Sequence, residues 1–95
     1  MSGFDKRMAG FRARFCARAA ADRAQIATAL ASGDFDEVRR LAHGLSGSGG
    51  VFGFPEVSAD AELVENAIDE GREPGELAIL CELLMQRLDE AAQRV

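Results

Sequence analysis

The chain has 95 residues, a formal net charge of −5 and an apolar fraction of 47%. A chain of this length fits one domain with a single hydrophobic core. No apolar run approaches the roughly 20 residues that span a bilayer, and the N-terminus lacks the apolar region of a secretion signal. Binding to nucleic acid or to an anionic membrane requires a concentrated basic patch, whereas the basic residues here are scattered. We therefore expect a single domain over residues 1–95, monomeric and cytoplasmic, without nucleic-acid or membrane partners.

A local excess of positive charge lies in the first part of the chain. Because Asp5 and Asp22 dilute it, we interpret it as a solvated helix face, with a binding surface as the less favoured alternative. The basic residues concerned are Lys6, Arg7, Arg12, Arg14, Arg18 and Arg23.

The two cysteines, Cys16 and Cys81, lie far apart in the sequence. In a chain without a secretion signal they are expected to be free thiols that pack as small hydrophobic side chains. One histidine without a close pair of cysteines does not supply the ligands of a metal site, so no bound metal ion is expected.

Apolar residues recur at intervals of three and four, which is the period of a helix rather than a strand. The first such stripe consists of Phe4, Met8, Phe11 and Phe15. It predicts a helix over residues 4–18, and a second helix is expected over residues 20–32, ended by Ser32-Gly33. The run Ala19-Ala20-Ala21 would also allow the two to continue as one helix.

Asp34 marks the start of a third helix, predicted over residues 35–53. Its carboxylate is placed to accept a hydrogen bond from a free backbone N–H, while Glu37 reaches back as in a capping box. The apolar face of this helix comprises Phe35, Val38, Leu41, Ala42, Leu45 and Phe52.

Two more helices are expected, over residues 56–70 and 75–93. Pro55 suits the first turn of the former, and the segment 71–75, with two glycines and a proline, predicts a turn between them. Short connections between long amphipathic helices place consecutive helices antiparallel. The predicted fold is therefore all-α: an antiparallel four-helix bundle with an additional N-terminal helix.

His43 is the only histidine and lies within the third predicted helix. At about 100° per residue its side chain points roughly 140° away from the centre of the apolar face, so we expect it on the solvent side. Its neighbours on that face are Asp36, Arg39 and Arg40 on the preceding turns, and Ser46, Gly47 and Gly50 on the following turns.

The segment after His43 is rich in glycine, with Gly44, Gly47, Gly49, Gly50 and Gly53. Each glycine inside a helix costs about 0.5–1 kcal/mol relative to alanine. We interpret them as clearing space for the backbone of another protein beside His43. In an alternative, the helix stops at Gly44 and residues 44–54 form a loop. Leu45 and Phe52 continue the apolar stripe in phase, which favours the helix.

Other chemistries fit this segment poorly. Residues 44–48 form neither a nucleophile elbow nor a phosphate-binding loop. Ser46 lies within a turn of His43, but no orienting acid or oxyanion hole is evident. A carboxylate cluster on the following helix is interpreted as solvated surface without a general acid–base role. Its members are Glu62, Glu65, Asp69 and Glu70.

The segment Ala42-His43-Gly44-Leu45-Ser46-Gly47, followed by Gly53, resembles the signature of histidine-containing phosphotransfer (HPt) domains, Ala-His-x-Leu-Lys-Gly with a further glycine six residues on. Gly33-Asp34 matches the Gly-Asp that precedes the phosphorylated helix. Phe15 and Val64-Glu65 match positions in the helices on either side. The resemblance covers roughly residues 11–70, and the last helix fits by pattern alone.

The resemblance implies that His43 is the phosphoacceptor of a phosphorelay. Response-regulator receiver domains are the implied partners, and a hybrid histidine kinase is a further one. Mg²⁺ is then expected on the receiver and no cofactor on this chain, because the receiver carries the electrostatic work of phosphoryl transfer. The chain is expected to be a carrier and not an enzyme.

One position departs from the family pattern. The usual Lys three residues after the histidine, thought to help stabilise phosphate charge, is Ser46 here. We expect Arg39 or Arg40 to take its place beside Ser46 in the phosphate environment, unless the receiver supplies the positive charge. The docking face for the receiver is predicted at Asp36, Gly47 and Gly50.

Two alternatives stay open. The chain could be a helical adaptor, a degenerate HPt domain that docks without being phosphorylated, and phosphate incorporation at His43 separates these functions. It could also be a fragment of a histidine kinase, which autophosphorylation from ATP would test. The sequence has no glycine-rich nucleotide loop with a lysine, which argues against the kinase.

Overall fold

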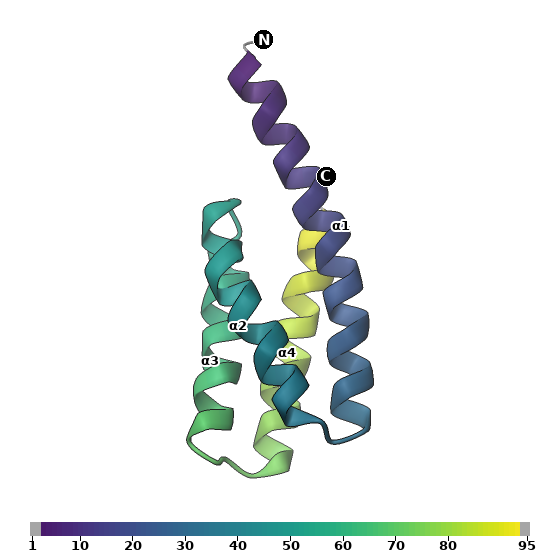
Figure 1. Cartoon of the computed structure of the whole chain (residues 1–95), viewed down its shortest axis with the longest axis vertical. Coiled ribbons are helices and arrows are strands. Elements are labelled where there is room, and N and C mark those ends of the chain that lie inside the picture. Colours follow the sequence, from purple (N-terminus) through teal and green to yellow (C-terminus); the bar gives the residue numbers. More distant parts are fainter. Residues whose placement is uncertain (1–2, 94–95) are drawn as a thin grey trace.

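The computed structural model describes residues 3–93, and its regular structure is helical throughout this range. The four helices are α1 (Gly3–Ala31), α2 (Phe35–Val51), α3 (Pro55–Asp69) and α4 (Pro74–Ala92). Helices α1 and α3 each pack against both α2 and α4, which gives an antiparallel four-helix bundle (Figure 1). The predicted all-α class and the bundle are confirmed.

The additional N-terminal helix is not confirmed, because the segments predicted as 4–18 and 20–32 form the single helix α1. Nothing between them interrupts the helical hydrogen bonds, and the junction consists of Ala19-Ala20-Ala21, three copies of the residue with the highest helix propensity. Ala19 is fully buried, so the junction itself belongs to the core. Figure 1 shows the first turns of α1 extending beyond the other helices. The side chains of Phe4 and Met8, predicted to start the apolar stripe, lie outside the described part of the chain.

Helix α2 continues through the glycine-rich segment and ends at Val51, short of the predicted residue 53. The alternative in which residues 44–54 form a loop is therefore wrong. Helices α3 and α4 each begin and end one position before the predicted ranges of 56–70 and 75–93. Proline is compatible with the first helical position, where its missing N–H removes no helical hydrogen bond, and both helices begin with it.

Glycines in the left-handed conformation end α1 and α2. Gly33 has a φ of 71° and Gly53 a φ of 87°. After α1, the N–H of Asp34 donates to the carbonyl of Ala29 at 2.8 Å. The equivalent bond after α2 runs from Phe54 N–H to Gly49 at 2.8 Å. These bonds satisfy carbonyls that a helix end would otherwise leave free and turn the chain back at once.

The start of α2 is only partly as predicted. The Asp34 carboxylate accepts a hydrogen bond from the backbone N–H of Glu37 at 3.2 Å, which confirms the cap. The Glu37 side chain does not reach back to complete a capping box, because it pairs with Arg40 one turn later. A charge-assisted contact to a guanidinium is stronger than a bond to a neutral backbone N–H.

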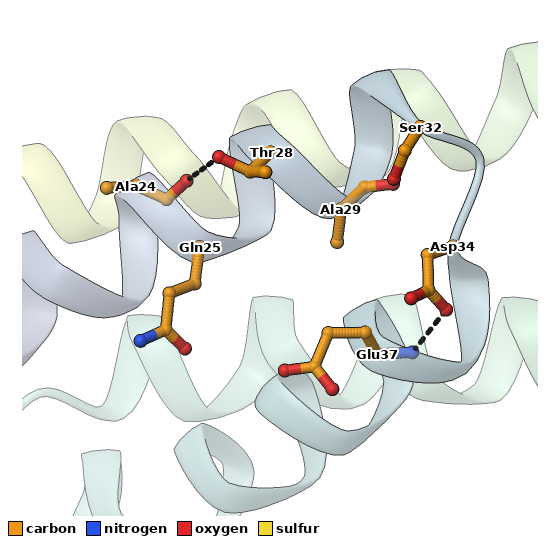
Figure 2. A pocket seen from close by; sticks show the side chains of 7 residues that line it. All are labelled: Ala24, Gln25, Thr28, Ala29, Ser32, Asp34 and Glu37. Carbon is orange, nitrogen blue, oxygen red and sulfur yellow. Dashed lines mark hydrogen bonds between the residues drawn. The ribbon is translucent and has the colours of Figure 1, made fainter.

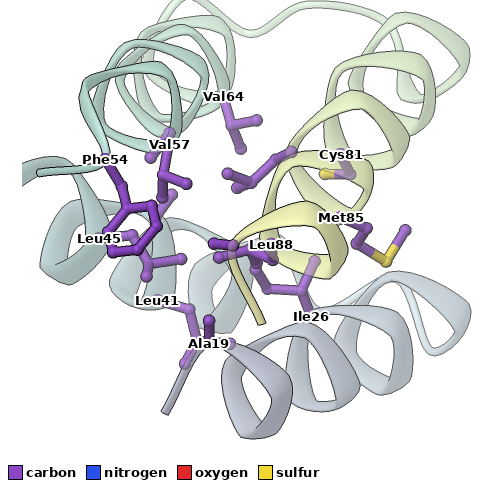
Figure 3. Close-up of a cluster of buried hydrophobic side chains, with 14 of the residues drawn as sticks. Ala19, Ile26, Leu41, Leu45, Phe54, Val57, Val64, Cys81, Met85 and Leu88 are labelled. Atoms are coloured by element: carbon purple, nitrogen blue, oxygen red, sulfur yellow. The ribbon is translucent and has the colours of Figure 1, made fainter. Parts of the chain in front are cut away.

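The core lies along the axis of the bundle and draws on all four helices (Figure 3). Its largest fully buried side chains are Ile26, Leu45, Leu84, Leu88, Val38, Val57 and Val64. Cys16 and Cys81 are free and buried, as predicted. Burial raises the pKa of the Cys81 thiol to about 11, so this cysteine stays protonated and packs as a small apolar side chain.

Gly49 lies where α2 meets the start of α3. A Cβ atom at this position would fall 2.9 Å from the backbone nitrogen of Ser58 and 3.0 Å from the carbonyl oxygen of Phe54. Both are backbone atoms and cannot rotate away. Gly49 therefore serves packing inside the protein, and the interpretation that it clears space for another protein is wrong.

Gly49 and Gly50 should respond to alanine in opposite directions. Gly49→Ala is expected to lower the free energy of unfolding by about 1–3 kcal/mol, because an added methyl group forces the helices apart. Gly50 has no atom within 4 Å of the equivalent position. Gly50→Ala should therefore raise the free energy of unfolding by up to about 1 kcal/mol, because alanine has the higher helix propensity. Urea denaturation of both variants checks this. A Gly49→Ala protein as stable as its parent would contradict the close approach.

Candidate functional site

His43 lies in the middle of α2 and projects into solvent. Its side chain is 71% exposed, which confirms the predicted orientation. The reason is local, because the buried residues Leu41, Ala42 and Leu45 fix the opposite face of this turn against the bundle. A single histidine is thus presented on a helix that the core holds rigidly.

Glu65 on α3 sits directly beside the imidazole. Its carboxylate Oε2 lies 2.7 Å from His43 Nδ1. The Glu65 side chain is only 13% exposed, so this carboxylate is held in place rather than free in solvent. A carboxylate acceptor requires the hydrogen to be on Nδ1, and in the neutral imidazole the lone pair is then on Nε2. The contact therefore leaves the lone pair of Nε2 free on the solvent side of the ring.

Arg39 connects Glu65 to a second carboxylate. Its Nε and Nη2 donate to the two oxygens of Asp69 at 2.6 and 3.1 Å. Arg39 Nη2 also lies 3.6 Å from Glu65 Oε2. The hydrogen bonds from Arg39 lower the pKa of Asp69. Arg39 therefore contacts two carboxylates of α3, both on the Nδ1 side of the histidine.

The other two residues predicted in the phosphate environment are also engaged. Arg40 forms a two-point ion pair with Glu37 on its own helix, which lowers the pKa of Glu37. The Ser46 hydroxyl donates to the carbonyl of His43 at 2.8 Å. Arg39 and Arg40 lie about one turn before His43 on α2 and Ser46 about one turn after it, and each of these side chains already has a partner within the chain.

The residues predicted as a docking face lie on the exposed side of α2. Asp36 is exposed, and a Cβ atom added to Gly47 or Gly50 would meet nothing within 4 Å. The helix surface on the C-terminal side of His43 is therefore bare backbone that an approaching molecule can reach.

The sequence interpretation missed the role of Glu65. It treated the carboxylates of α3 as one solvated cluster, and for Glu62, which is exposed, this is correct. Glu70 is also exposed and pairs with Arg72. The apolar stripe of this helix offered one signal, because Glu65 directly follows Val64. Val64 is fully buried, so Glu65 begins at the edge of the packed face. Only the packing of α3 on α2 brings its carboxylate to His43.

A pocket of about 370 Å³ lies elsewhere, between α1 and the start of α2 (Figure 2). Three of its polar side chains bond to nearby backbone: Thr28 donates to Ala24, Ser32 donates to Ala29, and Asp34 accepts from the N–H of Glu37. The lining residues are Ala24, Gln25, Thr28, Ala29, Ser32, Asp34 and Glu37. This arrangement presents no converging reactive groups, so we place the functional site at His43.

Comparison with known proteins identifies the class. The model of the Hpt domain family matches residues 10–95, which include α2, α3, α4 and most of α1. The chain therefore belongs to the Hpt domain family, whose members are histidine-containing phosphotransfer modules of two-component signalling. No significant match to a curated protein or to a solved structure was found. Within residues 3–93, no helix is long and apolar enough to cross a membrane.

The Glu65 contact makes a prediction about the tautomer of His43. When the imidazole is neutral, the hydrogen should reside mainly on Nδ1, which faces the carboxylate. Glu65→Ala should remove this preference, whereas Glu62→Ala, an exposed carboxylate of the same helix, should not. Long-range ¹H–¹⁵N NMR spectra of the imidazole measure the tautomer ratio. The same ratio in the parent and in Glu65→Ala would show that the contact does not control it.

Proposed function

We propose that His43 accepts a phosphoryl group from the aspartyl phosphate of a receiver domain and passes it to another. The observation that carries this proposal is the pairing of an exposed imidazole with an almost buried carboxylate, His43 Nδ1 to Glu65 at 2.7 Å, in an Hpt domain. This pairing supports a nucleophile with a fixed orientation and a free Nε2.

The transfer step follows from the tautomer. The lone pair of Nε2 attacks phosphorus in line, and the bond between phosphorus and the aspartyl oxygen breaks, with its electron pair leaving on the carboxylate. The imidazole gains positive charge as the bond to phosphorus forms. Glu65 faces that charge through the hydrogen on Nδ1, so it stabilises the transition state on the side away from the phosphoryl group. The reverse sequence returns the group to a second aspartate.

On this proposal the chain is a carrier without turnover of its own. Mg²⁺ belongs to the receiver, where it neutralises the phosphate and the aspartate. A hybrid histidine kinase is a further donor. The runner-up function is an adaptor that docks a receiver without accepting phosphate, and it gains nothing from a histidine whose tautomer is fixed by a neighbouring carboxylate.

The bare surface beyond His43 supports docking on the same face. Gly47 and Gly50 follow the histidine by one and two turns, and neither has a neighbour within 4 Å of a Cβ position. A receiver must bring the phosphoryl group on its aspartate within bonding distance of Nε2. This requires the backbone of the receiver to pass close to the surface of α2. Asp36 lies on the preceding turns and marks the other end of this face.

His43→Gln should stay folded and accept no phosphoryl group. The position is exposed, so the free energy of unfolding should change by less than about 0.5 kcal/mol. Incubation with phosphoramidate, and separately with a phosphorylated receiver domain, followed by mass spectrometry measures uptake. In the parent, the label should be lost in acid and kept in base, as for a phosphorus–nitrogen bond. Equal uptake by His43→Gln would refute the proposal.

Gly50→Gln should slow transfer from a phosphorylated receiver at least about tenfold, because a long side chain obstructs the approach to His43. The fold should remain intact, since nothing lies within 4 Å of this position. The matched control is Gly75→Gln in the first turn of α4, which also has no neighbour within 4 Å. Rapid-quench kinetics and thermal melts of the same samples separate transfer from stability. Transfer by Gly50→Gln at the rate of the control would place the docking face elsewhere.

A further inference from the structure

A phosphoryl group on His43 would need a cation that is still available to it. The chain carries a net charge of −5, and Glu65 adds a negative charge immediately beside the imidazole. Arg39 is bound to Asp69 and lies near Glu65, and Arg40 is bound to Glu37 at two points. Both candidates from α2 are therefore already paired with carboxylates. Ser46 contributes a hydroxyl without charge.

Arg18 reaches the same turn of α2 from a different helix. Its Nη2 lies 3.7 Å from the position that a Cβ atom would take at Gly44, the residue that follows His43. The guanidinium thus lies beside the Gly44 position of α2, at a distance that would be an ordinary van der Waals contact for an added methyl group. The Arg18 side chain is 60% exposed, so its guanidinium is accessible from solvent beside the turn of α2 that carries His43.

The pairing of Arg18 differs from that of Arg39 and Arg40. Its only ion pair among the described residues is a single contact from Nε to Asp22 at 3.5 Å. Asp22 is buried and fixes the inner end of the guanidinium, while the Nη2 end points towards Gly44. A planar guanidinium held at one edge presents its other N–H groups in the geometry that suits phosphate oxygens.

The other arginines in this part of α1 point elsewhere. Arg12 Nη2 lies 3.1 Å from the Cβ position of Gly53, beyond the end of α2. The guanidinium of Arg14 lies over the ring of Phe11 at 5.1 Å. Arg23 pairs with Asp89 on α4 at 3.1 Å. Of the α1 arginines with described side-chain contacts, Arg18 is the one placed beside the His43 turn.

We propose that Arg18, on α1, binds the phosphoryl group on His43 and supplies the positive charge that Ser46 does not. This inference rests on the proposed function and extends it, because it assigns the phosphate-binding cation to a helix outside the histidine motif. Arg18 is thus a phosphate-binding residue that Asp22 holds beside the His43 turn. The basic residues of the first part of α1 accordingly include one with a role beyond a solvated face.

The test uses the full chain and phosphoramidate as the phosphoryl donor, so no partner protein is needed. Arg18→Gln should shorten the lifetime of phosphorylated His43 about three- to tenfold, as expected for loss of one exposed cation next to a dianion. Arg18→Lys should keep most of the lifetime because it keeps the charge. The control is Arg23→Gln, which removes the same charge from the same helix at a remote position.

Two further measurements separate charge from structure. The difference between Arg18→Gln and the parent should shrink at about 1 M salt, where the screening length falls to about 3 Å. Ser46→Lys in the Arg18→Gln background should restore the lifetime, because it returns a cation to the same phosphate. Thermal melts of the unphosphorylated proteins monitor folding. A change in phosphohistidine lifetime without a change in melting temperature then reports the interaction of Arg18 with the phosphoryl group.

The outcomes distinguish this inference from the function on which it rests. If the parent is labelled on His43 and Arg18→Gln loses the label no faster than Arg23→Gln, Arg18 does not bind the phosphate and the proposed carrier function stands. An effect of Arg40→Gln larger than that of Arg18→Gln would likewise overturn the assignment. Absence of label on the parent protein would overturn the proposed function, and this inference with it.

Discussion

The close approach of α2 to α3 determines the geometry around His43. At Gly49 the two backbones come so near that a Cβ atom would lie 2.9 Å from Ser58. Further along the pair, the Ser58 hydroxyl donates to the carbonyl of Ser46 at 2.6 Å, and Glu65 meets His43 at 2.7 Å. Hydrogen bonds of this length weaken steeply when their atoms move apart. The alignment of the imidazole therefore depends on a glycine almost two turns away.

The same helix pair balances the charge of the nearly buried Glu65. A carboxylate removed from water requires a compensating partner, and Arg39 lies 3.6 Å from it while binding Asp69 on the next turn of α3. This arrangement places positive charge beside the carboxylate that faces Nδ1 of His43. It also explains why Arg39, about one turn before His43, is not free for a phosphate. Because Arg40 is likewise paired with Glu37, the proposed phosphate-binding cation comes from another helix.

The glycines of α2 have different physical roles despite their proximity in the sequence. Gly49 is required by packing and Gly53 by its positive φ, whereas Gly47 and Gly50 are helical and meet no neighbour. Gly47 and Gly50 lower the stability of the helix relative to alanine, and no packing contact within the protein requires them. Such a trade-off between stability and function is typical of binding surfaces, where a small residue leaves the backbone accessible to a partner.

The sequence by itself determined the helical class, the turns and the exposure of His43. These follow from local chemistry: the apolar period, prolines that can begin helices, Gly33 after α1, and a helical wheel that needs no knowledge of the neighbours. The sequence did not decide whether α1 is one helix or two, because the alanine run permits both and only burial of Ala19 in the core selects one. The partners of His43 were decided by tertiary structure. Glu65 and Arg18 lie 22 and 25 residues from it in the chain, and no periodicity within one helix encodes which side chains of another helix it will meet.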